Sequence, residues 1–163
     1  MTKINIEKTV RDLIETFLIA GEVSINLRNK GLIKKIKSDN TPVSNGDLEV
    51  NKIIINKLKE LTPSIPIISE ETSDNKSIED IKDFWLVDPI DGTYDYINNL
   101  EEFTINAGLI LDRKPVAGLI YAPAKKRMFY SYGEGNAYEL INENEIKIDG
   151  SRNYNKNKIK FVS

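Results

Sequence analysis

The spacing of hydrophobic residues in the first part of the chain predicts two amphipathic helices. The first spans about residues 5–29 and ends at Gly31, and its apolar face would pack on the core. The second follows a polar, turn-rich loop at residues 37–47. Between them, residues 33–37 alternate weakly and predict an edge strand whose lysines oppose pairing with another chain. The apolar positions of the two helices are Ile6, Val10, Leu13, Ile14, Phe17, Gly21 and Ile25 in the first, and Val50, Ile54, Leu58 and Leu61 in the second.

The rest of the chain changes to short apolar runs that predict β-strands. Residues 65–69 and 84–87 are compact, and each run is followed by acidic residues. Four later runs are joined by short turns, which indicates an antiparallel meander. These runs are 103–111, 116–121, 128–132 and 137–141. The predicted fold class is therefore α+β, with two long helices layered on an antiparallel sheet of about six strands.

The last part of the chain is poor in structural signals. Residues 142–157 are rich in Asn, Glu and Lys, and the Asn/Lys-rich segment 153–158 predicts a surface linker. Residues 159–162 begin another apolar run, which stops at Ser163.

The most informative stretch runs from Trp85 to Thr93, where an apolar strand gives way to two carboxylates, a proline and a glycine. Pro89 cannot donate to a β-ladder, so we expect the chain to leave the sheet at Asp88. Gly92 allows the backbone to approach a ligand closely, and amides that follow such a glycine favour anions. Two carboxylates beside an anion site predict a metal ion together with a phosphate group.

A second acidic segment, Glu70 and Glu71, follows the neighbouring predicted strand. If the two strands pair, Glu70 would converge with Asp88 and Asp91 at one sheet edge. The plainer alternative is that Asp-Pro-x-Asp-Gly forms a turn and that the glutamates are solvated surface residues. Clustered carboxylates repel one another, and a divalent cation would relieve that repulsion. Metal binding is therefore the favoured interpretation.

Asp47 lies at the start of the second predicted helix. Taken alone, this position favours a helix N-cap, in which the carboxylate accepts a hydrogen bond from the first turn.

The composition of the chain limits which metal ligands and catalytic groups it can offer. The chain has 163 residues, which predicts one domain, and it contains neither cysteine nor histidine. Thiolate and histidine metal sites, disulfides and Ser-His-Asp triads are therefore excluded, and the remaining oxygen ligands suit magnesium. The 23 basic and 25 acidic residues are interspersed, so no field directs the chain to a nucleic acid polymer or a membrane surface. Because no apolar run approaches the ~20 residues of a membrane span, a cytoplasmic location is expected.

Several motifs between residues 30 and 163 resemble the motifs of one protein family and occur in the same order along the chain. Asp88-Pro-Ile-Asp-Gly-Thr93 with Ser69-Glu-Glu71 upstream is similar to the signature of the lithium-sensitive, magnesium-dependent phosphomonoesterases that include inositol monophosphatase. The more specific resemblance is to the CysQ-type 3'(2'),5'-bisphosphate nucleotidases. It rests on Asp39-Asn-Thr-Pro-Val43, the following Asp47, Glu102-Phe-Thr-Ile-Asn106 and Gly118-Leu-Ile-Tyr-Ala-Pro123.

The resemblance implies a ligand set for magnesium. Glu70, Asp88 and the main-chain carbonyl of Ile90 would hold one ion, Asp88 and Asp91 would share a second, and the complete family fold holds two or three. Glu71 would lie beside this cluster and bind through water. Two such cations can activate a water and stabilise the leaving oxygen at phosphorus.

The resemblance also implies catalytic and substrate-binding roles. Thr93, polarised by Asp47, would orient or deprotonate the attacking water, and the amides of Gly92 and Thr93 would hold phosphate oxygens. This role of Asp47 competes with helix capping, although one carboxylate can do both. The expected substrate is a small phosphorylated molecule, most specifically a nucleotide bisphosphate.

Two features depart from the family pattern. The segment from Tyr94 to Tyr96 stands where CysQ-type proteins carry a Lys-Glu-Phe-like sequence. The family's carboxyl-terminal domain, with a Trp-Asp-x-Ala-like motif, has no counterpart, since the one tryptophan is Trp85. Residues 1–163 are therefore expected to form an amino-terminal metal- and phosphate-binding domain with impaired hydrolysis of adenosine 3',5'-bisphosphate. The alternatives are an inositol monophosphatase-like enzyme and a non-enzymatic metal- or phosphate-binding domain that needs a partner chain. Self-association through the surface left by the missing domain is also expected.

Overall fold

A computed structural model describes residues 4–36, 41–71 and 81–149. Two long helices, α1 (Ile6–Lys30) and α2 (Asn45–Leu61), accompany a short helix α3 (Thr93–Ile97) and a 3-10 turn η2 (Pro123–Lys125). The strands are β1 (Lys34–Ile36), β2 (Pro42–Ser44), β3 (Ile67–Ser69), β4 (Phe84–Asp91), β5 (Thr104–Leu111), β6 (Lys114–Ala122), β7 (Arg127–Ser131), β8 (Ala137–Ile141) and β9 (Asn144–Lys147).

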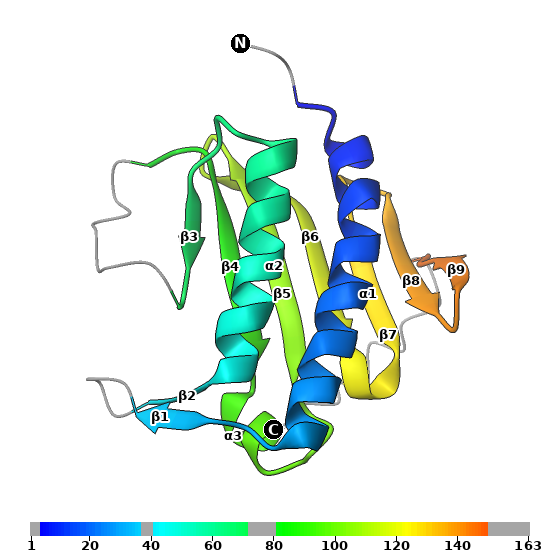
Figure 1. The fold of residues 1–163 in the computed structure, drawn as a ribbon. Helices are drawn as coiled ribbons and strands as arrows, with labels where there is room; N and C mark the ends of the chain where they lie inside the picture. The colour runs from blue at the N-terminus through cyan, green and yellow to red at the C-terminus, as the bar shows by residue number, and fades with distance from the viewer. Residues whose placement is uncertain (1–3, 37–40, 72–80, 150–163) are drawn as a thin grey trace, which may run out of the picture.

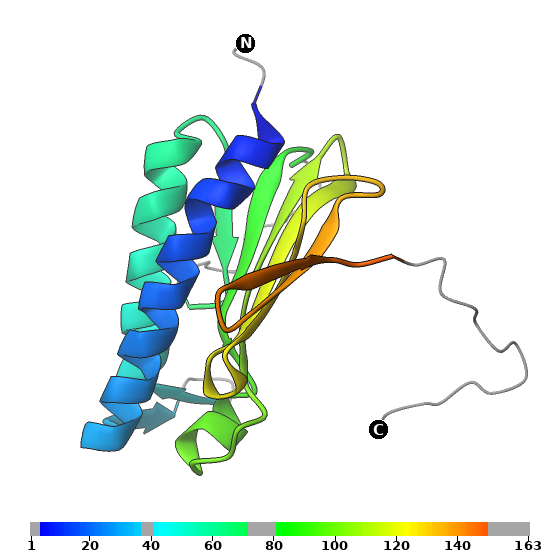
Figure 2. The same cartoon turned by 90° about the vertical axis from the view of Figure 1, so that its right-hand side faces the viewer.

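Strands β3 to β9 form one sheet in sequence order. The first pair, β3 and β4, is parallel, and each later neighbouring pair is antiparallel. Helices α1 and α2 lie side by side across one face of this sheet (Figures 1 and 2). The predicted α+β layering is thus confirmed, and the sheet is one strand larger than expected.

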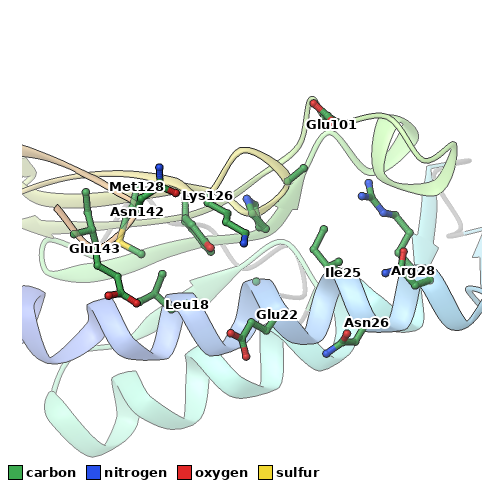
Figure 3. A pocket seen from close by; sticks show the side chains of 16 residues that line it. Leu18, Glu22, Ile25, Asn26, Arg28, Glu101, Lys126, Met128, Asn142 and Glu143 are labelled. Carbon is green, nitrogen blue, oxygen red and sulfur yellow. The ribbon is translucent and has the colours of Figure 1, made fainter. Parts of the chain in front are cut away.

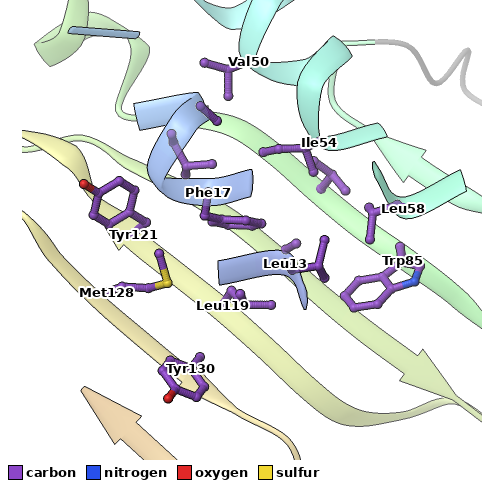
Figure 4. Close-up of a cluster of buried hydrophobic side chains, with 14 of the residues drawn as sticks. Leu13, Phe17, Val50, Ile54, Leu58, Trp85, Leu119, Tyr121, Met128 and Tyr130 are labelled. Atoms are coloured by element: carbon purple, nitrogen blue, oxygen red, sulfur yellow. The ribbon is translucent and has the colours of Figure 1, made fainter. Parts of the chain in front are cut away.

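The core fills the space between the two helices and the sheet. Leu13 and Phe17 of α1 and Ile54 of α2 point toward Leu119 of β6, and all four are fully buried (Figure 4). Trp85 of β4 is also fully buried, and its indole Nε1 donates to the Thr62 hydroxyl at 3.0 Å. This contact fixes β4 against the carboxyl end of α2.

The opposite face of the sheet is covered by none of the described helices (Figure 2). It carries exposed apolar side chains, among them Leu86 at 49%, Ile120 at 50% and Ile148 at 43% exposure. We call these three residues the outer sheet face. Within the described part of the chain, no helix is long and apolar enough to cross a membrane.

The expectation that the chain leaves the sheet at Asp88 is wrong. Strand β4 continues to Asp91, and the pairing with β5 shifts register between Asp88 and Asp91. The irregularity accommodates Pro89, because a bulged strand has positions that do not donate to the ladder.

Two further strands were not predicted. The loop expected at 37–47 contains β2, which pairs with β1 in a separate two-stranded sheet, so β1 is not an edge of the main sheet. The polar stretch expected at 142–157 contains β9, whose residues are all exposed. The predicted linker at 153–158 and the apolar run at 159–162 lie outside the described residues.

Candidate active site

Asp47 is held in the first turn of α2 by several donors. Its Oδ2 accepts hydrogen bonds from the Ser44 amide at 2.8 Å and the Ser44 hydroxyl at 2.6 Å. The Ser44 side chain in turn accepts from the Gly46 amide at 3.1 Å, so Ser44 is the N-cap and Asp47 closes a capping box. The prediction of Asp47 itself as N-cap is therefore wrong by three residues, because the hydroxyl upstream takes that position.

The other carboxylate oxygen of Asp47 faces Thr93. Thr93 Oγ1 lies 3.2 Å from Asp47 Oδ1 and 3.0 Å from the main-chain oxygen of Ile90. Asp47 is 1% exposed and Thr93 is half-buried, so this contact is partly shielded from solvent. Two residues 46 positions apart in sequence, from α2 and α3, are thereby brought together, as the family resemblance implied.

The start of α3 depends on Gly92. Gly92 is the N-cap with φ of 87°, a left-handed conformation that glycine adopts without strain. A Cβ added at this position would lie 2.7 Å from the carbonyl oxygen of Glu102, so no larger residue fits. The structure thus shows a close approach of Gly92 to the protein's own backbone, and the predicted approach to a ligand stays a prediction.

Glu70 and Asp88 meet because β3 and β4 are parallel neighbours. Ser69 is paired with Val87, and the Glu70 amide donates to the Val87 carbonyl at 3.2 Å. Burial, together with the negative charges of Glu70 and Asp91 and a hydrogen bond to Glu70, raises the pKa of Asp88 to about 7. The convergence of these carboxylates is thus a source of repulsion in the metal-free protein.

Asp88 also has an unused acceptor. Its Oδ1 is buried and finds no hydrogen-bond donor among the described residues, and the same holds for Oδ1 of Asn106, the cross-strand partner of Asp88. Asn106 Nδ2 donates to Asp91 Oδ2 at 3.3 Å. Buried oxygens without donors are sites where a cation would restore the lost solvation.

These acidic side chains do not form a ready-made cage. In the described ranges, no group of three or more acidic side chains is arranged so that it could hold a metal ion. The donor types nevertheless suit magnesium, which takes few protein carboxylates and keeps several waters. Glu71, the remaining predicted residue, is half-buried, and its amide lies 3.4 Å from the Ser69 hydroxyl.

Comparison with known proteins places this geometry in a family. The model of the inositol monophosphatase family matches residues 7–160. The chain belongs to the inositol monophosphatase family. Among curated members, a 3'(2'),5'-bisphosphate nucleotidase CysQ of Aggregatibacter actinomycetemcomitans is 35% identical over 141 residues, which are 85% of this chain and 52% of that protein. The CysQ of Salmonella typhimurium is 41% identical over 104 residues, covering 63% of this chain and 42% of that protein.

Solved structures of the inositol monophosphatase family share the fold. CysQ from Bacteroides thetaiotaomicron is 29% identical, with a TM-score of 0.66 over 81% of this chain and 48% of that one. A staphylococcal inositol monophosphatase reaches a TM-score of 0.74 over 85% of this chain and 52% of that one at 21% identity, which supports the fold alone. The chain spans about half the length of the curated relatives it matches.

Sequence reasoning gave no role to three residues around the candidate site. Ser44 caps α2 and fixes Asp47, Asn106 contacts Asp91, and Tyr96 of α3 is fully buried. The Ser-x-x-Asp spacing was a readable signal for the first. The contact of Asn106 depends on the β4–β5 register, which sequence periodicity does not give.

Proposed function

We propose that this chain supplies the metal- and phosphate-binding half of a magnesium-dependent phosphomonoesterase that acts on a 3'(2'),5'-bisphosphate nucleotide. For adenosine 3',5'-bisphosphate the products would be AMP and phosphate. The observation that carries the proposal is the partly buried Asp47–Thr93 contact, together with the Glu70 and Asp88 carboxylates, whose charges interact with each other. The substrate class is supported by the curated CysQ proteins that are 35% and 41% identical.

Magnesium would be held by oxygen ligands from the ends of β3 and β4. Glu70, Asp88 and the Ile90 carbonyl would hold one ion, and Asp88 with Asp91 would hold a second. The Oδ1 of Asp88 fits this role, because it is buried without a hydrogen-bond donor among the described residues and a cation would bind it instead. When bound, the metal would supply Lewis-acid stabilisation of charge at the phosphoryl oxygens.

Thr93 and Asp47 would handle the proton. A hydroxyl has one proton, so Thr93 can donate either to Asp47 or to the Ile90 carbonyl, which lie at similar distances. If the Ile90 carbonyl is engaged as a ligand, the Thr93 proton is directed to Asp47. The hydroxyl oxygen of Thr93 then presents its lone pairs to the attacking water and orients it for in-line displacement.

Phosphate oxygens would lie against the main-chain amides of Gly92 and Thr93. The left-handed Gly92 turns the chain sharply into α3, which is the geometry in which successive amides can face one anion. Because Gly92 is fixed by the Glu102 backbone, these donors would need little reorganisation.

The test is phosphate release from adenosine 3',5'-bisphosphate and inositol 1-phosphate with magnesium, paired with calorimetric titration of magnesium. We expect Asp91→Asn to abolish both metal binding and release, whereas Thr93→Ala should abolish release and spare metal binding. Equal loss of metal binding in both variants would mean that the segment is only a structural turn. A clear preference for the inositol compound would overturn the nucleotide assignment.

The same proposal covers the domain organisation. Residues 1–163 would form the amino-terminal metal- and phosphate-binding unit, and the outer sheet face would be where a second unit packs. For residues 1–163 on their own, we expect two copies to associate through this apolar face. Light scattering after size exclusion should then show a dimer that Ile120→Glu converts to monomer; a wild-type monomer at high concentration would refute self-association.

A further inference from the structure

Helix α3, which carries Thr93, is attached to helix α1 through Tyr96. Tyr96 follows Thr93 by three residues and is fully buried. Its hydroxyl donates to the main-chain oxygen of Ser24 in α1 at 2.7 Å. Since a buried hydroxyl of this kind has one donor proton and a fixed acceptor, the contact sets both the depth and the rotation of α3.

Tyr96 also determines the spacing between α3 and α2. A Cβ added to Gly46 would lie 2.3 Å from the Tyr96 hydroxyl oxygen and 2.7 Å from ring atom Cε1. The ring therefore packs directly against the backbone of Gly46, the residue before Asp47. One side chain thus contacts all three helices: it lies on α3, bonds to α1 and abuts the first turn of α2.

Arg28 provides a second attachment one turn further along α1. Its Nη1 donates to the Leu100 carbonyl at 2.7 Å, and its guanidinium lies 5.8 Å from the centre of the Tyr96 ring and 5.2 Å from that of Phe103. In Figure 3 Arg28 extends from α1 toward the segment that carries Glu101. Ser24 and Arg28 are four residues apart, so both attachments lie on one face of α1.

We propose that Tyr96 and Arg28 are positioning residues that hold Thr93 against Asp47, so that α1 controls turnover without contributing a group that touches the substrate. This inference rests on the proposed function, since it concerns the same Thr93–Asp47 pair. The Thr93–Asp47 contact is 3.2 Å long and joins two separate elements, so a small rotation of α3 would break it. Asp47 is held within α2 by its own capping box, which leaves the placement of α3 as the variable.

Kinetics distinguish positioning from general stability. Tyr96→Phe removes only the hydroxyl, and Arg28→Gln removes the charge at the edge of an open pocket of about 840 Å³. We expect each change to lower kcat for adenosine 3',5'-bisphosphate about tenfold or more, with less than about a twofold change in KM. In a Thr93→Ala background the same changes should have no further effect on kcat, because they act through Thr93.

Matched controls lie on strand β7, which pairs with β6 and β8 and carries none of the candidate site residues. Tyr130→Phe removes another buried tyrosine hydroxyl, which bonds to Glu145. Arg127→Gln removes another arginine that pairs with a carboxylate, Glu139, and lies over a ring, that of Phe129. Both controls should leave kcat within about twofold of wild type even where the melting temperature falls as far as in the test variants.

Amide hydrogen exchange tests the attachment independently of hydrolysis. The Tyr96 amide donates to Gly92 and the Leu100 amide to Asp95, both at 2.9 Å. We expect Tyr96→Phe and Arg28→Gln to lower the protection of these two amides about tenfold or more, with no change in β7. If wild type releases no phosphate, the proposed function fails while exchange still decides the inference. Unchanged protection in both variants, or a fall in kcat equal to that of the controls, would overturn it.

Discussion

Asp88→Asn should stabilise the metal-free protein while it abolishes magnesium binding. Burial and the charges of Glu70 and Asp91 raise the pKa of Asp88 from 3.8 to about 7, so at pH 8 the fold holds an ionised carboxylate in an unfavourable place. A shift of ~3 units corresponds to ~4 kcal/mol at ~1.4 kcal/mol per unit. Because Asp88 is partly exposed, solvent screens the repulsion, and we expect about 1–2 kcal/mol.

The sign of the pH dependence follows from the raised pKa. Below about pH 4 the carboxyl of Asp88 is protonated in both folded and unfolded chains, and it costs no stability. As the pH rises from about 4 to 7 the unfolded chain loses this proton first, so the wild-type free energy of unfolding falls relative to that of Asp88→Asn. The advantage of the variant should therefore be smaller at pH 5 than at pH 8, where it is complete.

Thermal unfolding in EDTA measures this difference. We expect Asp88→Asn to melt about 2–8 °C above wild type at pH 8, and Glu134→Gln, an exposed charge in the turn after β7, to match wild type. Excess magnesium should reverse the order, because it stabilises only the chain that binds it. A variant that melts below wild type in EDTA at pH 8 would refute the idea that the carboxylates repel one another.

Three further substitutions test the contacts that hold the elements around the site in place. Gly92→Ala should lower the free energy of unfolding by about 1–3 kcal/mol, measured by urea titration, because the residue has a φ of 87° and its Cβ would meet the Glu102 carbonyl. Thr62→Val keeps the shape but leaves Nε1 of Trp85 without an acceptor, which should cost about 1–3 kcal/mol in the same titration. Ser44→Ala removes the cap of α2 and should cost about 1–2 kcal/mol and lower helix content measured by circular dichroism.

Each of these predictions has a contradicting result. Gly133→Ala is the control for Gly92, since Gly133 also has positive φ but an added Cβ there meets nothing within 4 Å. Equal losses at the two glycines would show that the Glu102 contact is unimportant. A Thr62→Val protein as stable as wild type would mean that the indole finds another acceptor, and unchanged helix content in Ser44→Ala would argue against the capping box.

The sequence predicted those elements that need only an apolar surface to pack against, whichever residues supply it. Helices α1 and α2 follow from periodic apolar residues that any core would accept. Helix α1 lies within one residue of its predicted bounds, and α2 begins inside the loop predicted at 37–47. Strand β9 was missed because its four residues are all exposed, so no apolar pattern marks it, and its backbone pairs only with β8. The end of β4 was placed too early because Pro89 was read as a stop, whereas a register shift absorbs it.

The site was predictable to the level of residue types and not of contacts. Carboxylates after two apolar strands indicated that Glu70 and Asp88 meet, since parallel strands end at one edge. The partner of Tyr96 is a main-chain oxygen 72 residues away, and no side-chain pattern encodes such an acceptor. The position of Asp47 within its helix likewise depended on which hydroxyl upstream took the cap.

Asp47 and Asp88 differ in how many of their carboxylate oxygens find hydrogen-bond donors within the protein. Asp47 accepts hydrogen bonds from Ser44 and lies within reach of Thr93, so its charge is stabilised by the fold itself. Asp88 has a buried oxygen without a donor and neighbours of like charge. Removal of a bound cation should therefore leave the Asp47–Thr93 pair in place and loosen only the ends of β3 and β4. On the proposed function, the Asp47–Thr93 pair would be in place before the metal binds, and the carboxylate cluster would be the part of the site that metal binding completes.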